Sequence, residues 1–165
     1  MKALRVINPW DQSVTLERAW DSESSIARKL AAAVRAQAAW RRVPVGERIR
    51  QVRRGLSYFR QNREALAREL TLQVGKPLPQ ARREVAVCLE RAEHMLSIAK
   101  ECLAPELLPE KAGFHRRIES VPLGVVLDIA AWNYPLLIPV NVVVPALLAG
   151  NAVLLKHSAK TPLCG

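Results

Sequence analysis

The sequence predicts an α/β fold in which a helical region is followed by one strand–helix–strand unit of a parallel sheet. Apolar residues recur at intervals of three, four and seven over residues 21–103, which is the spacing of amphipathic helices. Two short apolar runs follow, Val125–Ala130 and Ala152–Leu155, as expected for strands buried on both faces. Leu136–Leu148 between them is long enough to form the helix that joins two parallel strands.

The first twenty residues predict a small hairpin, because Leu4–Ile7 and Val14–Leu16 are short extended runs on either side of the turn signal Asn8-Pro9. Asp21–Ser24 is typical of a helix N-cap. The helix that follows should end between Trp40 and Pro44. Its expected apolar face consists of Ile26, Leu30, Val34 and Ala38.

Two further helices are expected before residue 105. The second runs from about Val45 to Val74 and ends at Gly75, because Lys76–Pro79 contains two prolines. Its stripe is formed by Ile49, Val52, Leu56, Phe59, Leu66 and Leu70, and that of the third helix by Val85, Leu89, Ala92, Leu96, Ala99 and Leu103. Three such helices in a row would also suit a non-catalytic binding module, which remains the alternative interpretation.

Beyond Pro105 we expect a loop over residues 105–113 and a connecting strand over Phe114–Val121, before the strand–helix–strand unit. The predicted organisation is therefore an extended arm over residues 1–20, a helical region over 21–113 and the start of a sheet over 114–165. A two-stranded parallel sheet cannot cover both of its faces. An open edge, an uncovered face and low solubility are the expected result.

The formal charge of +10 raises the question of a nucleic-acid partner. Residues 28–91 carry 16 Lys or Arg and five Glu. These charges alternate with apolar residues at helical spacing, which favours solvated helix faces. No recognisable nucleic-acid-binding motif is present, so we expect no nucleic-acid partner.

The sequence also gives little indication of a membrane span, a metal site or a secretory signal. The apolar stretch from Val121 to Leu155 is interrupted by Asp128, Asn133, Asn141 and four prolines, which argues against a membrane span. The three cysteines and three histidines follow no metal-binding spacing. With no secretory signal at the N-terminus, the expected location is the cytoplasm.

Polar residues follow both predicted strands. Asn133 comes after the first strand and Lys156 directly after the second. Ligands of open α/β sheets collect at these carboxyl ends. There an amide can donate a hydrogen bond to an oxygen that gains charge, and an ammonium can contact ribose hydroxyls or phosphate. Taken singly, Asn133 would equally suit a turn, and a solvated lysine would be the favoured interpretation of Lys156.

Taken together, these segments resemble the aldehyde dehydrogenase family. Pro122–Val126 with Trp132–Pro135 is similar to the family's P-L-G-V-V strand followed by P-W-N-[FY]-P, and Pro145–Lys156 is similar to P-A-L-A-A-G-N-x-V-V-x-K. Upstream, further matches occur in the same order along the chain. They are Trp40-Arg41, Arg48, Val74–Pro77, Ala81 and Glu84-Val85.

The resemblance implies a Rossmann-like NAD(P)-binding sheet, with residues 21–113 as the helical region of the cofactor domain. It also implies oxidation of a small aldehyde or semialdehyde to a carboxylic acid through a thiohemiacetal, by a homo-oligomer when complete. Asn133 would form half of the oxyanion hole, and Lys156 would bind the adenosine ribose. The cofactor cleft would further be lined by Ile129, Ala130, Ala131, Trp132, Ser158 and Ala159.

Several positions depart from the family pattern. Ala131 and His157 stand where prolines are usual, and Ala159 stands where many members carry a glutamate that disfavours a 2′-phosphate. With Lys160 beside it, NADP+ should be tolerated as well as NAD+. Comparable affinities of a full-length relative with these residues for the two cofactors would support this hypothesis, and strong rejection of NADP+ would end it.

These 165 residues lack two of the catalytic groups that the family resemblance implies. Neither Cys88, Cys102 nor Cys164 lies in the family's nucleophile context, and the general-base glutamate is missing as well. We therefore expect the 165 residues to form an N-terminal fragment that is inactive by itself.

Overall fold

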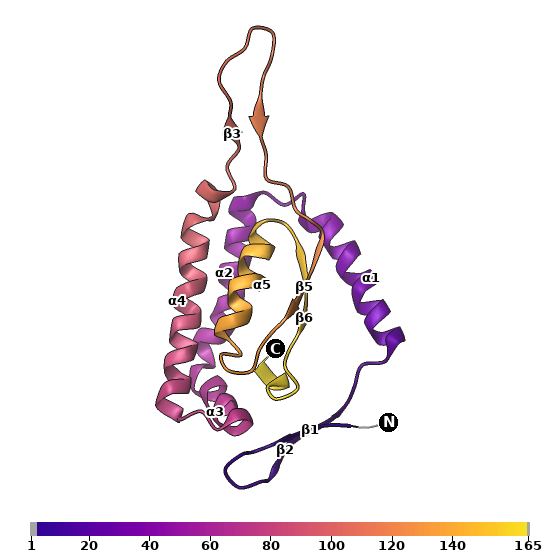
Figure 1. The fold of residues 1–165 in the computed structure, drawn as a ribbon. Coiled ribbons are helices and arrows are strands. Elements are labelled where there is room, and N and C mark those ends of the chain that lie inside the picture. The colour runs from indigo at the N-terminus through magenta and orange to yellow at the C-terminus, as the bar shows by residue number, and fades with distance from the viewer. Residues whose placement is uncertain (1–2, 165) are drawn as a thin grey trace.

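The computed structural model describes residues 3–164, so the outermost residues of the predicted arm and of the predicted sheet region (1–2 and 165) lie outside it. The chain opens with the expected antiparallel hairpin, Ala3–Ile7 (β1) with Val14–Ala19 (β2). Four helices follow: Glu23–Trp40 (α1), Val45–Gln61 (α2), Arg63–Val74 (α3) and Leu78–Cys102 (α4). In Figure 1, α1 lies apart from α2 and α4, on the other side of a small sheet.

Local sequence signals explain where these helices begin and end. Ser22 caps α1, because its hydroxyl accepts a hydrogen bond from the backbone N–H of Ser25 at 3.2 Å. Gly75 ends α3 in the left-handed region, at φ 69°, which glycine adopts without a Cβ penalty. Pro77 precedes the first turn of α4. The predicted N-cap and the predicted stop at Gly75 are thus confirmed.

The single helix predicted over Val45–Val74 is wrong. The chain leaves helical geometry at Asn62, where φ is −106° and ψ is 22°, and α3 starts at the next residue. The Asn62 side-chain amide donates to the carbonyl oxygen of Tyr58 at 2.9 Å, and asparagine commonly competes with the helix backbone in this way. The apolar stripe continues across the break because α2 and α3 both pack on α4.

The prediction for residues 105–121 was wrong in part. Glu106–Leu107 (β3) and Arg117–Ile118 (β4) form a two-residue antiparallel ladder. A strand therefore lies within the expected loop. Of the expected strand Phe114–Val121, Arg117–Ile118 forms the ladder and Phe114 makes an isolated bridge with Lys111. This hairpin projects away from the helices in Figure 1. It includes residues on both sides of position 113, and the proposed division of the chain there stays a prediction.

The strand–helix–strand unit is confirmed. Val125–Ile129 (β5) pairs in parallel with Ala152–Lys156 (β6), and Leu137–Leu148 (α5) connects them. Figure 1 shows the two strands between α5 and α1, and both helices contact them. A short 3-10 helix, Pro162–Cys164 (η1), follows β6. The α/β prediction, with a helical region ahead of the first parallel unit, therefore holds.

The core lies between α4, α5, α2 and α3. Its most deeply buried members are Ala67, Leu70, Ala81, Val85, Ala92, Leu96 and Leu148. The expected apolar face of α1 does not join this core, because Ile26, Leu30 and Val34 are 46–53% exposed. Helix α1 instead packs through residues next to this face. Gln37 is buried and its amide donates to the Gly150 carbonyl oxygen, while the Trp40 indole donates to that of Leu147.

Within residues 3–164, no helix combines the length and apolar character that crossing a membrane requires. In the same part of the chain, no three His, Cys, Asp or Glu side chains are grouped so as to hold a metal ion.

Candidate functional site

The carboxyl ends of β5 and β6 lie side by side. Ile129 is the register partner of Lys156, and the Ala130 backbone N–H donates to the Lys156 carbonyl oxygen at 3.1 Å. The loop after β5 carries Asn133, and the loop after β6 carries Ser158 and Ala159. Parallel pairing therefore brings the two segments singled out in the sequence to one edge of the sheet.

The loop after β5 presents three consecutive exposed side chains. Trp132 is 51% and Tyr134 49% exposed, and Asn133 between them is also exposed. Pro135 and Leu136 behind them are buried and anchor the loop to the core. Among the hydrogen bonds of the described residues, Asn133 takes part through its backbone oxygen, which leaves its amide available to an incoming group.

The two loops are in contact through a cation and an indole. The Lys160 ammonium lies 4.8 Å from the centroid of the Trp132 ring, within the range of a cation–π interaction. The Ser158 hydroxyl accepts a hydrogen bond from the Lys160 backbone N–H at 3.2 Å, which holds the turn after β6. Lys156 and Lys160 are both exposed, so this edge of the sheet is positively charged.

The remaining residues expected in a cofactor cleft differ in how much surface they offer. Ile129 is 68% exposed, whereas Ala130 is 5% exposed and contributes mainly its backbone N–H to the sheet. Ala131, Ser158 and Ala159 are half-buried. The roles expected for these residues remain predictions.

Two titratable groups, one buried and one half-buried, lie next to this edge. Burial raises the pKa of the Asp128 carboxyl on β5, and its Oδ2 atom has no hydrogen-bond partner among the described residues. Burial lowers the pKa of His157, which directly follows β6, so its neutral form is favoured. Neither residue has a role predicted from the sequence. A carboxylate within an apolar strand was the available signal for Asp128.

A second feature that sequence reasoning missed is a buried ion pair beneath the Asn133 loop. Lys76 and Glu84 were noted as matches to a family pattern without a role, yet the Lys76 ammonium pairs with Glu84 and also donates to the Asn133 carbonyl oxygen at 2.9 Å. The available signal was Glu84 itself, because it is a charged residue within the stripe Ala81, Val85 and Cys88.

The thiols do not offer a nucleophile at this site. Burial raises the pKa of Cys88 to about 11 and that of Cys164 to about 12, so both remain protonated at neutral pH. Cys88 lies in α4 with its Sγ 3.7 Å from the Leu136 carbonyl oxygen. Cys102 is exposed at the last residue of α4, far along that helix from Glu84.

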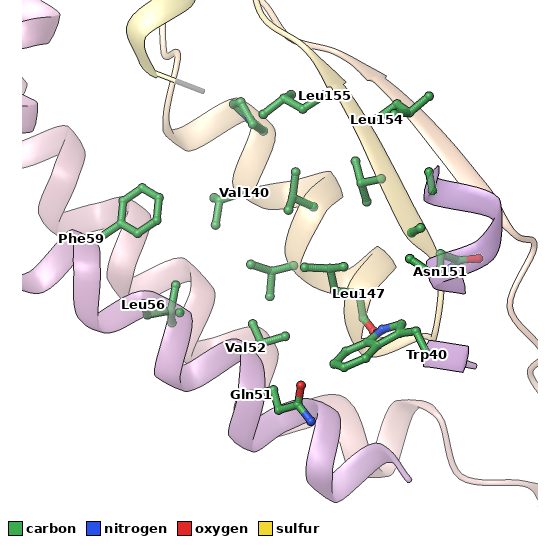
Figure 2. Close-up of a pocket in the computed structure, with 18 of the residues that line it drawn as sticks. Trp40, Gln51, Val52, Leu56, Phe59, Val140, Leu147, Asn151, Leu154 and Leu155 are labelled. Carbon is green, nitrogen blue, oxygen red and sulfur yellow. The ribbon is translucent and has the colours of Figure 1, made fainter. Parts of the chain in front are cut away.

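A large apolar hollow within the described residues lies elsewhere. It has a volume of about 1100 Å³ and is lined by α1, α2, α5 and β6. Figure 2 shows Val52, Leu56 and Phe59 of α2 facing Val140 and Leu147 of α5 across it. Neither Asn133 nor Lys156 lines it. Its walls are almost wholly apolar, which suits helix packing better than bond-making chemistry.

Comparisons with known proteins agree on one family. A sequence model described as the aldehyde dehydrogenase family matches residues 1–165. A 3,6-anhydro-alpha-L-galactose dehydrogenase of Vibrio sp. is 34% identical over 162 residues, which are 98% of this chain and 34% of that protein. An NADP(+) succinate-semialdehyde dehydrogenase of Deinococcus radiodurans is 37% identical over 123 residues, which are 74% of this chain and 26% of that protein.

Solved structures with a similar fold are also found. The structure of PnpE in complex with nicotinamide adenine dinucleotide superimposes with a TM-score of 0.91 at 29% identity, over 99% of this chain and 34% of that one. The chain thus spans about a third of the length of the relatives it matches.

Proposed function

The chain belongs to the aldehyde dehydrogenase family, and from this we propose that the complete protein oxidises an aldehyde to a carboxylic acid with NAD+ or NADP+. The expected substrates are small aliphatic aldehydes or semialdehydes. The observation that carries the proposal is the parallel pairing of β5 with β6. It brings an exposed amide and exposed ammonium groups together at the edge of a sheet where ligands of α/β proteins bind.

In this proposal Asn133 stabilises the oxygen that becomes negatively charged when a thiol attacks the aldehyde carbonyl. A neutral amide donor held at a fixed position stabilises such an oxyanion without reorganising during the reaction. Support comes from the exposure of Asn133 and from the engagement of its backbone rather than its side chain. The thiol and the general base of the thiohemiacetal mechanism would come from residues other than these 165, which by themselves should form no NAD(P)H.

The edge of the sheet also suits a dinucleotide on chemical grounds. Lys156 would contact ribose hydroxyls or phosphate, and the Trp132 indole offers an exposed apolar face. When bound, the nicotinamide accepts a hydride from the substrate. Ala159 and Lys160 leave room and positive charge for a 2′-phosphate, so either cofactor is compatible. Among the relatives, one is named for NADP(+) and another is bound to nicotinamide adenine dinucleotide.

The alternative of a helical binding module has less support. Such a module does not require two parallel strands that both end in exposed polar loops. Binding of an acidic macromolecule by the basic helices, without aldehyde-dependent reduction of NAD(P)+ by the complete protein, would favour it.

Substitution of Asn133 tests the proposal. In the complete protein, Asn133→Ala should lower kcat about 10²–10³-fold, the usual effect of removing one oxyanion donor. Cofactor affinity, followed by fluorescence titration, should stay the same. The measurement is NAD(P)H formation with a panel of aldehydes. Asn62→Ala is the matched control, because Asn62 is half-buried between α2 and α3 and belongs to neither the loop after β5 nor the loop after β6.

Two outcomes would contradict the proposal. If the wild-type protein formed no NAD(P)H with any aldehyde, the assigned activity would be wrong. If Asn133→Ala kept the wild-type kcat, the role of this residue would be wrong even though the activity was present.

A further inference from the structure

The loop that carries Asn133 rests on two buried charged side chains from a different part of the chain. Lys76 lies between α3 and α4 and Glu84 in the second turn of α4, with side chains 13% and 1% exposed. Both contact the loop after β5, which is more than fifty residues away in sequence. Burial of an ion pair is costly unless every charge is compensated, so the hydrogen bonds of this pair are informative.

Glu84 binds the start of α5. Its Oε1 accepts hydrogen bonds from the backbone N–H groups of Leu136 at 3.0 Å and Leu137 at 3.4 Å. These are the first N–H groups of a helix whose own N-cap residue provides no side-chain bond. A carboxylate at this position satisfies two otherwise free donors and interacts favourably with the helix dipole. Glu84 therefore fixes where the Asn133 loop ends.

Lys76 binds the middle of the same loop. Its ammonium pairs with the Oε2 atom of Glu84, donates to the Asn133 carbonyl oxygen at 2.9 Å, and lies 4.2 Å from the centroid of the Tyr134 ring. One cation thus contacts the backbone of Asn133 and the side chain that follows it. Gly75 at φ 69° lets the chain turn directly before this lysine.

We propose that Lys76 and Glu84 are positioning residues that hold the Asn133 loop in the geometry needed for its amide to act. The proposal rests on the function proposed above for Asn133. A displacement of about 1 Å at a reacting group can cost about 10²-fold in rate, and catalytic groups on loops depend on such supporting contacts. Neither residue contacts substrate in this scheme, since each acts through the backbone of the loop.

A purely structural role would stabilise the fold without a specific effect on Asn133. A double-mutant cycle separates the two roles, because residues that act through one another give non-additive effects. The pair is neutralised in the complete enzyme by Lys76→Met with Glu84→Gln, which leaves no unpaired buried charge. Glu84→Gln alone is the milder variant, since its amide oxygen can still accept from Leu136 and Leu137. Each is made both in the wild-type enzyme and in the Asn133→Ala variant.

In the wild-type enzyme, neutralising the pair should lower kcat about 10–100-fold, while the KM for aldehyde and the dissociation constant for NAD(P)+ change less than about threefold. In the Asn133→Ala variant, the same substitutions should change kcat less than about threefold. Glu84→Gln should act in the same direction with a smaller effect. Thermal melting shows whether each variant is folded. If the double substitution prevents folding, the cycle uses Glu84→Gln alone. Lys100→Met is the control, because Lys100 is exposed near the end of α4.

The outcomes separate this inference from the one on which it rests. If Asn133→Ala leaves kcat unchanged, the proposed role of Asn133 fails. If Asn133→Ala lowers kcat but neutralising the pair leaves kcat unchanged, only the positioning role is overturned. The same holds if neutralising the pair lowers kcat equally in the wild-type enzyme and in the Asn133→Ala variant.

Discussion

The three cysteines differ in how far their thiols are shielded from water. Cys88 is 4% exposed and packs in the core with Leu89 and Leu136. Cys164 is partly buried and its Sγ lies 3.6 Å from the Gln73 side-chain nitrogen, whereas Cys102 is exposed. Burial raises the pKa of Cys88 to about 11 and of Cys164 to about 12. Since the thiolate is the reactive form, both should be slow nucleophiles.

A thiol titration tests this ordering. At about pH 8, an aromatic disulfide reagent should modify one thiol of the native chain rapidly, and all three cysteines should react after unfolding. The rates for Cys88 and Cys164 should rise with pH, because deprotonation of each is incomplete until about pH 11 or above. Cys102→Ser should remove the rapid phase. Equal rates for three thiols in the native chain would contradict the burial of two of them.

The burial of individual side chains was predictable where it followed from the spacing of apolar residues within one helix. The stripe Val85, Leu89, Ala92 and Leu96 was predicted from its spacing and is buried. The function of Glu84 was not predictable in this way, because its partners are backbone N–H groups 52 and 53 residues further on. Spacing within one helix carries no information about such distant partners.

At the scale of elements, helix and strand type were predictable and some boundaries were not. The parallel strands were recognisable because each is a short apolar run flanked by glycine or polar residues. The break at Asn62 was not, because the same apolar period continues through it and α2 and α3 share α4 as a partner. The β3–β4 ladder has only two residues in each strand, too few for any alternation to be visible.

The connection from α5 to β6 depends on one glycine. Gly150 has φ +91°, and a Cβ at this position would collide with the Arg48 guanidinium. Its carbonyl oxygen accepts from the Gln37 amide at 3.1 Å, so the turn also contacts α1. The Arg48 guanidinium would have to move, and an L-residue would be strained at this positive φ whatever the space.

Gly150→Ala should therefore lower the free energy of unfolding by about 1–3 kcal/mol. Urea unfolding followed by circular dichroism measures this change. Gly55→Ala is the matched control, because Gly55 is within α2 and nothing lies within 4 Å of its added Cβ. Alanine favours the helix there and should raise the free energy by about 0.5–1 kcal/mol. Shifts in the same direction for both variants would contradict this account of Gly150.

At the scale of the whole molecule, two apolar surfaces face solvent. Leu127 and Ile129 of β5 are 62% and 68% exposed, and Ile26 and Val34 of α1 are each 53% exposed. Part of the sheet on β5 is thus uncovered, as expected, although α1 and α5 both contact the strands. The exposure of α1 was not foreseen, because periodicity shows that a helix has an apolar face but not whether another element covers it.

These apolar surfaces occur on a chain with a net charge of +10. Like charges on separate molecules repel each other, and salt screens this repulsion over a Debye length of about 10 Å at 0.1 M. Apolar attraction is not screened by salt, and salts that are excluded from protein surfaces strengthen it. The balance between the two should therefore decide how far the 165-residue chain stays in solution.

We predict that the chain binds a hydrophobic dye when folded and associates increasingly as sodium chloride is raised from about 0.02 to 0.5 M. Replacing Ile26, Leu30 and Val34 together by glutamine should weaken both effects. Each half-exposed aliphatic side chain contributes about 0.5–1 kcal/mol when covered, so the loss should exceed about tenfold in association constant. Sedimentation velocity and dye fluorescence are the measurements.

The control for this prediction changes charge on the same helix without changing its apolar face. Arg28→Gln with Arg35→Gln lowers the positive charge of α1, and both arginines are exposed. Association at low salt should then increase, because repulsion falls while the apolar surface is kept. If instead the glutamine variant of the apolar face associated as strongly as the wild type at every salt concentration, the exposed face of α1 would not be what drives association.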